Sequence, residues 1–286
     1  MTRKIRITAD STCDLGKDLT EKLGVDISPL HIVYGTESYD DCVDIFPADI
    51  IKRYSEKKEL PKTAAVSVGE YIEMFKKHVD EGYDIVHISL GSSISSSHQN
   101  AVAAAADMDN VFVVDSQNLS TGSGLLVLKA VDMVNNTELS AKEIADTITE
   151  AASKVHMSFV LDDLEFLRAG GRCSMLAALG ANLLSIKPCI EVDSSKGSAM
   201  SVGRKYRGKL EKVVPQYTRE KLSQYTTFDP ARAIIVSRDV SEEITANVHE
   251  IVSSLGIFKE ILTAEAHCTI TSHCGAGTIG VCFMTK

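Results

Sequence analysis

The chain has 286 residues, of which 44% are hydrophobic, and this suits one large globular domain or two moderate ones. The formal net charge of −9 argues against a nucleic-acid binder, because no basic surface offsets the 39 acidic residues. The first residues, MTRKIRITADST, lack a long apolar stretch and predict neither a signal peptide nor an anchor, and no segment has the roughly 20 apolar residues that span a membrane. Its seven scattered cysteines, with no CxxC pair, favour reduced thiols and a cytoplasmic location.

Short apolar runs alternate with amphipathic stretches through residue 155. They predict strands at residues 5–9, 25–34, 85–90 and 111–114. They predict helices at residues 16–23, from Pro47 onward, at 71–79, at 101–106, at 120–135 and at 140–155. Pro29 interrupts the second strand and indicates an edge or a bulge there. The alternation is typical of a doubly wound α/β fold with a parallel sheet.

A second unit begins after residue 155. Strands are expected at residues 156–161, 185–192, 233–236, 260–266 and 281–284, and residues 200–204 are expected to pair back as a hairpin. Helices are expected at residues 164–169, 176–183, 207–225 and 241–255.

Residues 85–101, IVHISLGSSISSSHQNA, predict a buried strand, a serine-rich loop and the start of an alanine-rich helix. Free N–H groups and the positive end of the helix dipole face such a loop, so a carboxylate or a phosphate would suit this position. The serines could equally do no more than cap the helix and form a solvated turn.

Asp10 and Thr63 are two further polar candidates. Asp10 follows the first strand, at the sheet edge where ligands bind in open α/β folds, but capping of the next helix explains it as well. Thr63 lies in an extended segment before the capping box formed by Ser67 and Glu70. A threonine in an extended segment is ordinarily a strand former, so its sequence position alone does not assign it a function.

A cluster of cysteines and histidines near the C-terminus raises the question of zinc. His267, Cys268, His273 and Cys274 are expected on or beside one strand, and no second ligand pair with zinc-finger spacing accompanies them. The sequence therefore predicts no metal site.

Seven segments occur in the order seen in a known family. They are DSTCDL (10–15), KTAAVSVGEY (62–71), SSISSSHQNA (92–101), VVDSQNLSTGSG (113–124), LEFLRAGGRCS (164–174), LLSIKPCIEVDSSKG (183–197) and HCGAGTIG (273–280). Together they resemble the signature of the DegV family of fatty-acid-binding proteins, over nearly the whole chain. Residues 64–66 replace the usual Ser-Gln-Pro, and residues 96–98 replace Gly-Thr-Tyr. These departures affect ligand preference more than ligand class.

The resemblance implies an α/β fold of two domains. Residues 1–155 are expected to form a three-layer domain with a parallel sheet, and residues 156–286 a two-layer α/β domain with a mixed sheet. A long-chain fatty acid would lie between them. Its carboxylate would bind Thr63, Ser95, Ser96 and His273.

The resemblance also implies a non-catalytic protein without a cofactor. It is similar to the lipid-carrying subunit of a bacterial fatty-acid kinase, in which a separate ATP-binding protein phosphorylates the bound carboxylate. The chain has no Walker P-loop pattern, as this role requires. Transient contact with a membrane surface fits the same role.

Basic residues supply candidates for docking a kinase or neutralising a transferred phosphate. Arg172 of the GGR motif is the main candidate, and Arg204 is a secondary contact for the carboxylate or the kinase. Lys205 and Lys209, in the same basic stretch as Arg204, fit a solvated face.

An enzyme is the alternative. An acyl or phosphoryl transferase could use Ser95 or Cys274 as nucleophile and His273 as base. The sequence has no Gly-x-Ser-x-Gly elbow, which favours the carrier.

Overall fold

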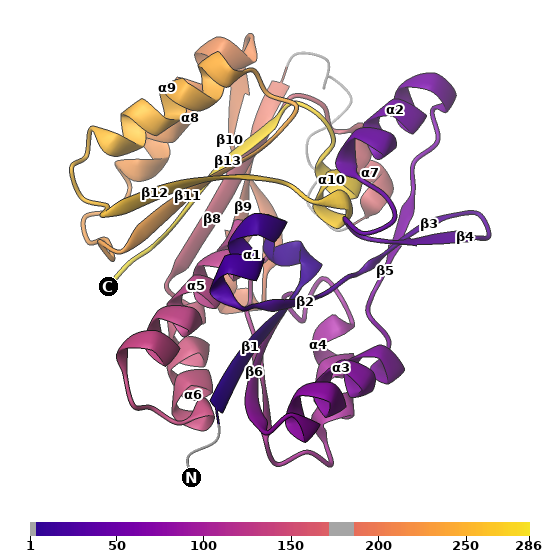
Figure 1. Cartoon of the computed structure of the whole chain (residues 1–286). Helices are drawn as coiled ribbons and strands as arrows, with labels where there is room; N and C mark the ends of the chain where they lie inside the picture. Colours follow the sequence, from indigo (N-terminus) through magenta and orange to yellow (C-terminus); the bar gives the residue numbers. More distant parts are fainter. Residues whose placement is uncertain (1–3, 172–185) are drawn as a thin grey trace.

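The computed structural model describes residues 4–171 and 186–286, and within these residues thirteen strands form three sheets. Figure 1 shows a parallel sheet in the lower half of the molecule and a mixed sheet above it, with a small antiparallel sheet at the side.

The parallel sheet has the strand order β2-β1-β6-β7. Its strands are β1 (Lys4–Asp10), β2 (Asp26–Ser28), β6 (Tyr83–Ser89) and β7 (Val111–Asp115). Around it lie α1 (Lys17–Leu23), α3 (Val68–Asp80), α4 (Ser97–Ala105), α5 (Thr121–Asn136) and α6 (Ala141–Ala152). Helices α3 and α4 pack on one face of the sheet, and α5 and α6 pack on the other (Figure 1). The expected three-layer arrangement with a parallel sheet is therefore confirmed.

Pro29 divides the segment that the sequence predicts as one strand at residues 25–34. The prediction was wrong: β2 ends at Ser28 in the parallel sheet, and β3 (His31–Tyr34) belongs to the antiparallel sheet β4-β3-β5. Proline has no N–H to donate to a ladder, so pairing stops there and the chain leaves the first sheet. The small sheet is completed by β4 (Glu37–Asp40) and β5 (Lys62–Ala64), which are joined through α2 (Pro47–Lys57).

The second large sheet is mixed, as expected, with the order β10-β9-β8-β13-β11-β12. Its strands are β8 (Val155–Leu161), β9 (Ile186–Asp193), β10 (Ala199–Arg207), β11 (Arg232–Arg238), β12 (Glu260–Glu265) and β13 (Thr278–Met284). Only β11 and β12 pair in parallel, and the predicted hairpin of β9 with β10 forms. One face is covered by α8 (Leu210–Leu222) and α9 (Glu242–Ser253). Helix α5 packs on the other face.

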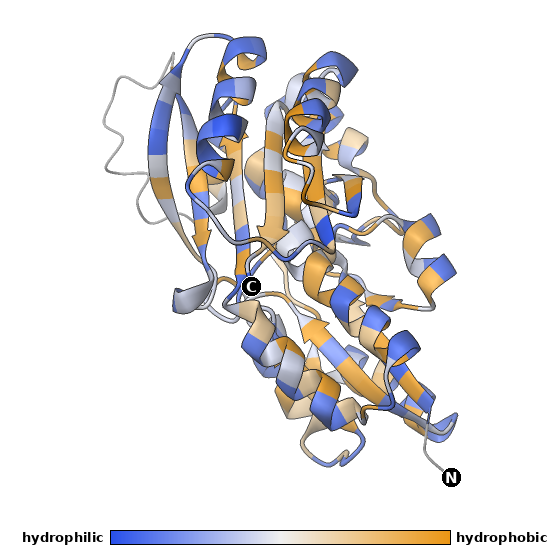
Figure 2. Cartoon of the chain, turned by 90° about the vertical axis from the view of Figure 1, so that its left-hand side faces the viewer, coloured by the Kyte–Doolittle hydropathy of each residue, from blue (hydrophilic) through white to orange (hydrophobic). Residues whose placement is uncertain are grey.

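Helix α5 therefore lies between the two large sheets. Its residues Leu125 to Leu128 are buried, and they belong to an apolar core that contains residues from both sheets, such as Ile88 and Phe159. Figure 2 shows hydrophobic residues concentrated along the strands, whereas the helices carry both hydrophilic and hydrophobic residues. One apolar core thus includes residues of both large sheets and of the helix between them.

Residues 268–274 form a helix, whereas the sequence places them on or beside a strand. Helix α10 (Cys268–Cys274) begins where the Asp41 carboxylate accepts hydrogen bonds from the backbone N–H groups of Cys268, at 2.7 Å, and Thr269, at 3.1 Å. This cap comes from a distant segment, so the β-branched sequence CTITSHC gives no local sign of it.

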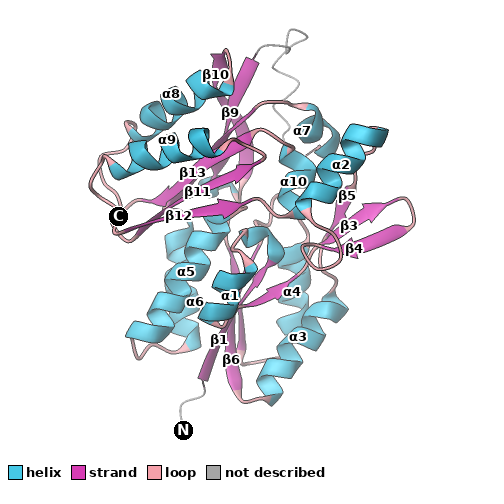
Figure 3. Ribbon diagram, turned by 45° about the horizontal axis from the view of Figure 1, so that its top comes forward, coloured by secondary structure: helices cyan, strands magenta, loops and turns pink. Residues whose placement is uncertain are grey.

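Short elements complete the described chain. They are the 3-10 helices η1 (Ser11–Cys13) and η3 (Ser194–Lys196) and the helix α7 (Glu165–Gly170). Figure 3 shows α7 and α10 close to the small sheet. Within the described residues, no helix has the length and apolar character that crossing a bilayer requires. The helix predicted at residues 176–183 lies outside the described residues.

Candidate functional site

A cavity of about 300 Å³ lies between the two large sheets. The parallel-sheet half and the small sheet contribute Leu30, Thr63, Ala64, Ala65, Leu90, Ile94, Ser95, Ser96 and Leu119. The mixed-sheet half contributes Phe159, Leu167, Met200, Thr269, Ile270, His273 and Cys274. The lining therefore depends on both parts of the chain.

Thr63 and His273 meet at one end of the cavity. Thr63 is the central residue of β5, and His273 lies in the last turn of α10. Thr63 Oγ1 and His273 Nε2 share a hydrogen bond of 2.9 Å. Both side chains are partly exposed and both line the cavity, so they can offer polar atoms to a ligand there.

The serine loop approaches the same end of the cavity. Helix α4 begins at Ser97 rather than at Ala101, so Ser95 and Ser96 lie directly at its N-terminus. Ser95 Oγ accepts the backbone N–H of Ser97 at 3.1 Å and lies 3.0 Å from Ser97 Oγ. The start of this nine-residue helix presents N–H groups and a positive dipole, which favours an anion.

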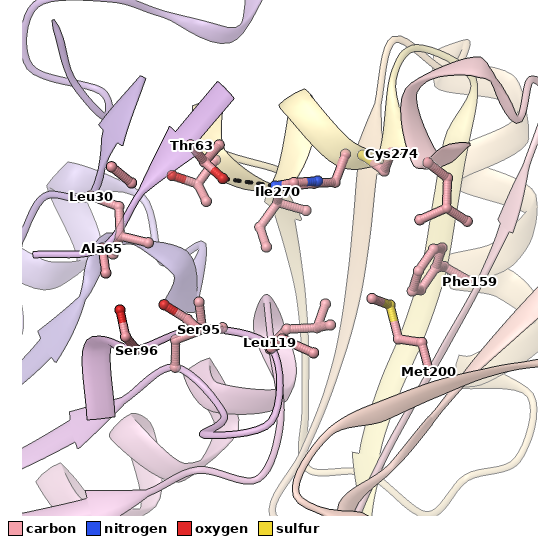
Figure 4. A pocket seen from close by; sticks show the side chains of 16 residues that line it. Leu30, Thr63, Ala65, Ser95, Ser96, Leu119, Phe159, Met200, Ile270 and Cys274 are labelled. Carbon is pink, nitrogen blue, oxygen red and sulfur yellow. Dashed lines mark hydrogen bonds between the residues drawn. The ribbon is translucent and has the colours of Figure 1, made fainter. Parts of the chain in front are cut away.

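The opposite end of the cavity is apolar. Figure 4 shows Thr63, Ser95 and Ser96 on one side and Phe159 and Met200 on the other. Phe159 extends from β8 and Met200 from β10, and both are buried. The cavity thus runs from a polar end to an apolar end, which suits an amphipathic ligand.

The polar end has a restricted set of binding groups. Among the described lining residues none is lysine or arginine, so the groups on offer are hydroxyls, one imidazole and helix N–H groups. Burial lowers the pKa of His98, which follows the loop in α4, so this imidazole stays neutral at neutral pH.

Gly170 fixes the position of the His273 ring. A Cβ atom at residue 170 would lie 2.0 Å from His273 Nδ1, so any larger residue would push the ring away. Gly170 ends α7 in the GGR motif, and α7 packs against α10. The sequence indicates only that Gly170 ends a short helix, because only the fold brings it next to His273.

Asp10 supports the serine loop from beneath. Its Oδ2 accepts the Leu90 N–H at 2.7 Å and its Oδ1 accepts the Tyr71 hydroxyl at 2.5 Å, while His87 Nε2 lies 3.4 Å from Oδ1. The side chain makes no capping bond to the helix that follows. Asp10 does not belong to the described cavity lining, so it orients the strand end before the loop.

The basic candidates lie elsewhere. Arg204, on β10, pairs with Glu220 at 3.0 Å, and its side chain is 61% exposed. Arg204 is not part of the described cavity lining. Arg172 lies outside the described residues.

Of the two candidate nucleophiles, Cys274 does not have a lowered pKa, and Ser95 has no neighbouring base among the described contacts. Burial raises the pKa of Cys274 to about 12, so the thiol stays protonated at neutral pH. Ser95 Oγ contacts a hydroxyl and an amide instead of a base. His273 bonds to Thr63, so the described contacts do not form the nucleophile–base pair that a transferase needs.

The apolar residues that line the cavity cannot be recognised from the sequence. Leu30, Leu119 and Met200 line the cavity, yet each occupies an ordinary apolar position in the sequence. A residue that faces a ligand and a residue that faces the core are both buried, so hydrophobic periodicity cannot separate them.

Comparisons with known proteins place the chain in a family. The model of the uncharacterised protein family DegV matches residues 4–286. A DegV domain-containing protein of Clostridium perfringens is 30% identical over 276 residues, with 95% of each chain covered.

Solved structures agree with this assignment. A DegV family protein from Thermus thermophilus, reported for fatty-acid binding, superposes with a TM-score of 0.90 at 25% identity, covering 99% of this chain and 100% of that one. The fatty acid kinase B3 protein of Streptococcus pneumoniae, loaded with linoleic acid, has the same fold, with a TM-score of 0.83 at 21% identity and coverage of 99% and 100%. The chain belongs to the DegV family, as its sequence motifs indicated.

Proposed function

We propose that this protein binds one long-chain fatty acid and presents its carboxylate to a separate kinase. The observation that carries the proposal is the cavity between the two sheets, which has hydroxyl and imidazole groups at one end and apolar side chains at the other. A fatty acid has the same division between a charged head and an apolar chain. The Thermus thermophilus relative, reported for fatty-acid binding, supports this choice of ligand.

The carboxylate binds at the end formed by Thr63, Ser95, Ser96 and His273. Hydrogen bonds to a charged group each contribute roughly 1.5 to 3 kcal/mol net. The N-terminus of α4 adds a favourable field at the same place. These groups hold the head without an ion pair from the described lining, so binding should depend only weakly on salt.

The acyl chain supplies most of the affinity. Each buried methylene contributes about 0.8 kcal/mol, so a dozen contribute about 10 kcal/mol before the costs of ordering are subtracted. The cavity, at about 300 Å³, lies at the lower end of the roughly 300–1,000 Å³ typical of ligand pockets. One acyl chain therefore fits this space better than a phospholipid with two chains.

A titration that compares palmitate with hexadecanol tests the binding mode. The two ligands share the apolar chain and differ at the head, so palmitate should bind at least tenfold more tightly. Equal affinities would contradict a specific carboxylate site, and saturation by neither ligand would remove the proposed function.

We propose that the partner is an ATP-dependent fatty-acid kinase, by analogy with the fatty acid kinase B3 protein of Streptococcus pneumoniae, which has the same fold. The chemistry supports a separate catalyst: Cys274 is a protonated buried thiol, and Ser95 has no described base. In the proposed reaction a carboxylate oxygen attacks the γ-phosphorus of ATP, and ADP leaves. The product is an acyl phosphate still bound to this protein.

Reconstitution with a bacterial fatty-acid kinase and ATP tests the partnership. Hydroxylamine traps an acyl phosphate as a hydroxamate and releases phosphate, so both products should form only when kinase, ATP and loaded protein are all present. Hydroxamate formation by the loaded protein and ATP alone would favour the transferase. The kinase must first be shown to be active with another fatty-acid-binding protein. If that kinase gives no product with this protein, the result would count against the partnership.

The two sequence halves have complementary roles in this proposal. Residues 1–155 supply the serine loop and Thr63, and residues 156–286 supply His273 and the apolar end. We propose that the protein works in the cytoplasm, where its kinase would find ATP.

A further inference from the structure

A second group of functional side chains lies at the first turn of α10. Asp41 and Cys42 follow β4, and His267 and Cys268 begin α10. None of these four residues lines the described acyl cavity, which instead contacts the next turn through Thr269 and Ile270. The group is therefore distinct from the proposed fatty-acid site.

Three members of this group lie close enough together to hold one metal ion. A carboxylate oxygen of Asp41, Cys42 Sγ and a ring nitrogen of His267 all lie within 4.8 Å of one another. Cys268 Sγ is not one of these mutually close atoms, but it lies 3.9 Å from Cys42 Sγ. Two sulfurs that each lie about 2.3 Å from a tetrahedral zinc ion are about 3.8 Å apart. The two thiols are thus already at the separation that zinc imposes.

His267 is oriented as a ligand. Its Nδ1 lies 3.0 Å from the backbone oxygen of Ser11. A carbonyl oxygen can only accept, so Nδ1 carries a proton, and Nε2 is the nitrogen that can bind a metal ion once it is deprotonated. Zinc-bound histidines typically donate their second nitrogen in this way, which fixes both tautomer and ring orientation.

Asp41 is held in place by the fold. It is buried, and its Oδ2 accepts the Ser11 hydroxyl at 2.9 Å and the Thr269 N–H. Its Oδ1 accepts only the Cys268 N–H among the described hydrogen bonds. A carboxylate oxygen has more than one lone pair, so Oδ1 can bind a cation while the cap of α10 stays intact.

Cys42 occupies a position that a cysteine adopts at a cost. Its φ of 59° lies in the left-handed region, where glycine is the residue without penalty. Such outliers cluster at functional sites. The side chain is partly exposed, so an ion can reach it from solvent.

We propose that Asp41, Cys42 and His267 bind one zinc ion, and that Cys268 Sγ turns toward the ion as the fourth ligand. Two sulfurs, one nitrogen and one oxygen form a donor set that suits tetrahedral zinc. Binding converts the thiols to thiolates, and their protons pass to solvent. Cys268 gives up its 3.1 Å hydrogen bond to the Ile45 carbonyl in this step.

The ion would join two segments that shape the fatty-acid site. One ligand pair follows β4 in the small sheet that contains Thr63, and the other begins the helix that contains His273. Cys42 and Cys268 are 226 residues apart in sequence. A zinc ion here would be structural and not catalytic, because it would link the end of the small sheet to the start of α10.

Zinc titration of the reduced full chain, purified without a histidine tag and competed against a chromophoric chelator, tests the proposal. We expect one zinc per chain. Cobalt in place of zinc should give thiolate-to-cobalt absorption. Cys42→Gly is the decisive variant, because glycine removes the ligand and also suits the positive φ, so the variant should fold well.

Loss of a group that only supports a metal ligand lowers metal affinity roughly 10- to 100-fold. Cys42→Gly and His267→Gln each remove a ligand, so each should lower zinc affinity by more than this. Cys189→Ser, a buried thiol on β9, and His249→Gln, an exposed position on α9, are the matched controls and should keep full affinity. Sub-stoichiometric binding by the native chain, or unchanged affinity in Cys42→Gly, would overturn the site. The zinc site would also be overturned if the reduced chain binds no zinc and mild oxidation joins Cys42 to Cys268 in a disulfide. The two cysteines would then be a redox pair.

Discussion

Thr63 Oγ1 lies 2.9 Å from His273 Nε2, although 210 residues separate them in sequence. The hydrogen bond joins the small antiparallel sheet to α10 and closes the polar end of the cavity. The proposed carboxylate site therefore exists only when both parts of the chain are folded together.

Replacing Thr63 by valine keeps the shape of the side chain and removes its hydroxyl. A hydrogen bond to a carboxylate contributes roughly 1.5 to 3 kcal/mol, so palmitate should bind roughly 10- to 100-fold more weakly. Isothermal titration of Thr63→Val measures the change. Thr147→Val, at a partly exposed position on α6 away from the described cavity lining, is the control and should bind like the native protein. Equal affinity in the two variants would remove Thr63 from the site.

Gly170→Ala should displace the His273 ring, because the new Cβ would lie 2.0 Å from Nδ1. The Thr63 bond then breaks, so affinity for palmitate should fall while affinity for hexadecanol changes little. A competition assay with both ligands separates these effects. Gly16→Ala is the control, since a Cβ there meets no atom within 4 Å. An equal loss for both ligands would mean that the cavity as a whole has collapsed.

Met200→Ala should lengthen the apolar end of the cavity. Met200 is buried and lines this end, so its removal leaves space for additional methylenes. The preference for stearate over myristate should rise, and the free energy of unfolding without ligand should fall by about 2 kcal/mol or more. Met108→Ala, outside the described cavity lining, should leave the preference unchanged. An unaltered preference in Met200→Ala would show that the chain ends elsewhere.

His156 should make stability depend on pH. Burial, together with the nearby Lys221 ammonium, lowers its pKa from 6.5 to about 4. Below pH 6.5 the unfolded chain gains a proton that the folded chain does not take up, so this residue destabilises the fold as pH falls towards 4. Urea unfolding should show that His156→Gln loses less stability than the native protein over this window. Parallel curves for the two proteins would contradict the assignment, and the exposed His249→Gln serves as the control.

Local sequence patterns predict most elements because their causes are local. The capping box at Ser67 and Glu70 forms as predicted, with Glu70 N–H donating to Ser67 Oγ. The serine loop also follows β6 and precedes α4, as predicted. Such signals lie within a few residues of one another and can be read without the fold.

The features that the sequence did not predict have distant causes. Helix α10 depends on Asp41, and the position of His273 depends on Gly170. The residues that share the cavity with Ser95 come from β5, β8, β10 and α10, and motif order alone does not show which of them meet. Family resemblance supplied Thr63 and His273 as candidates, and the fold showed that they are partners.

Native mass spectrometry of the purified full chain shows whether the protein holds a fatty acid. After release under denaturing conditions, any small molecule bound to the protein can be identified. We expect one long-chain fatty acid per chain, or an apo protein that gains the mass of one palmitate or oleate when either is added. An apo mass that stays unshifted with both fatty acids would contradict this expectation.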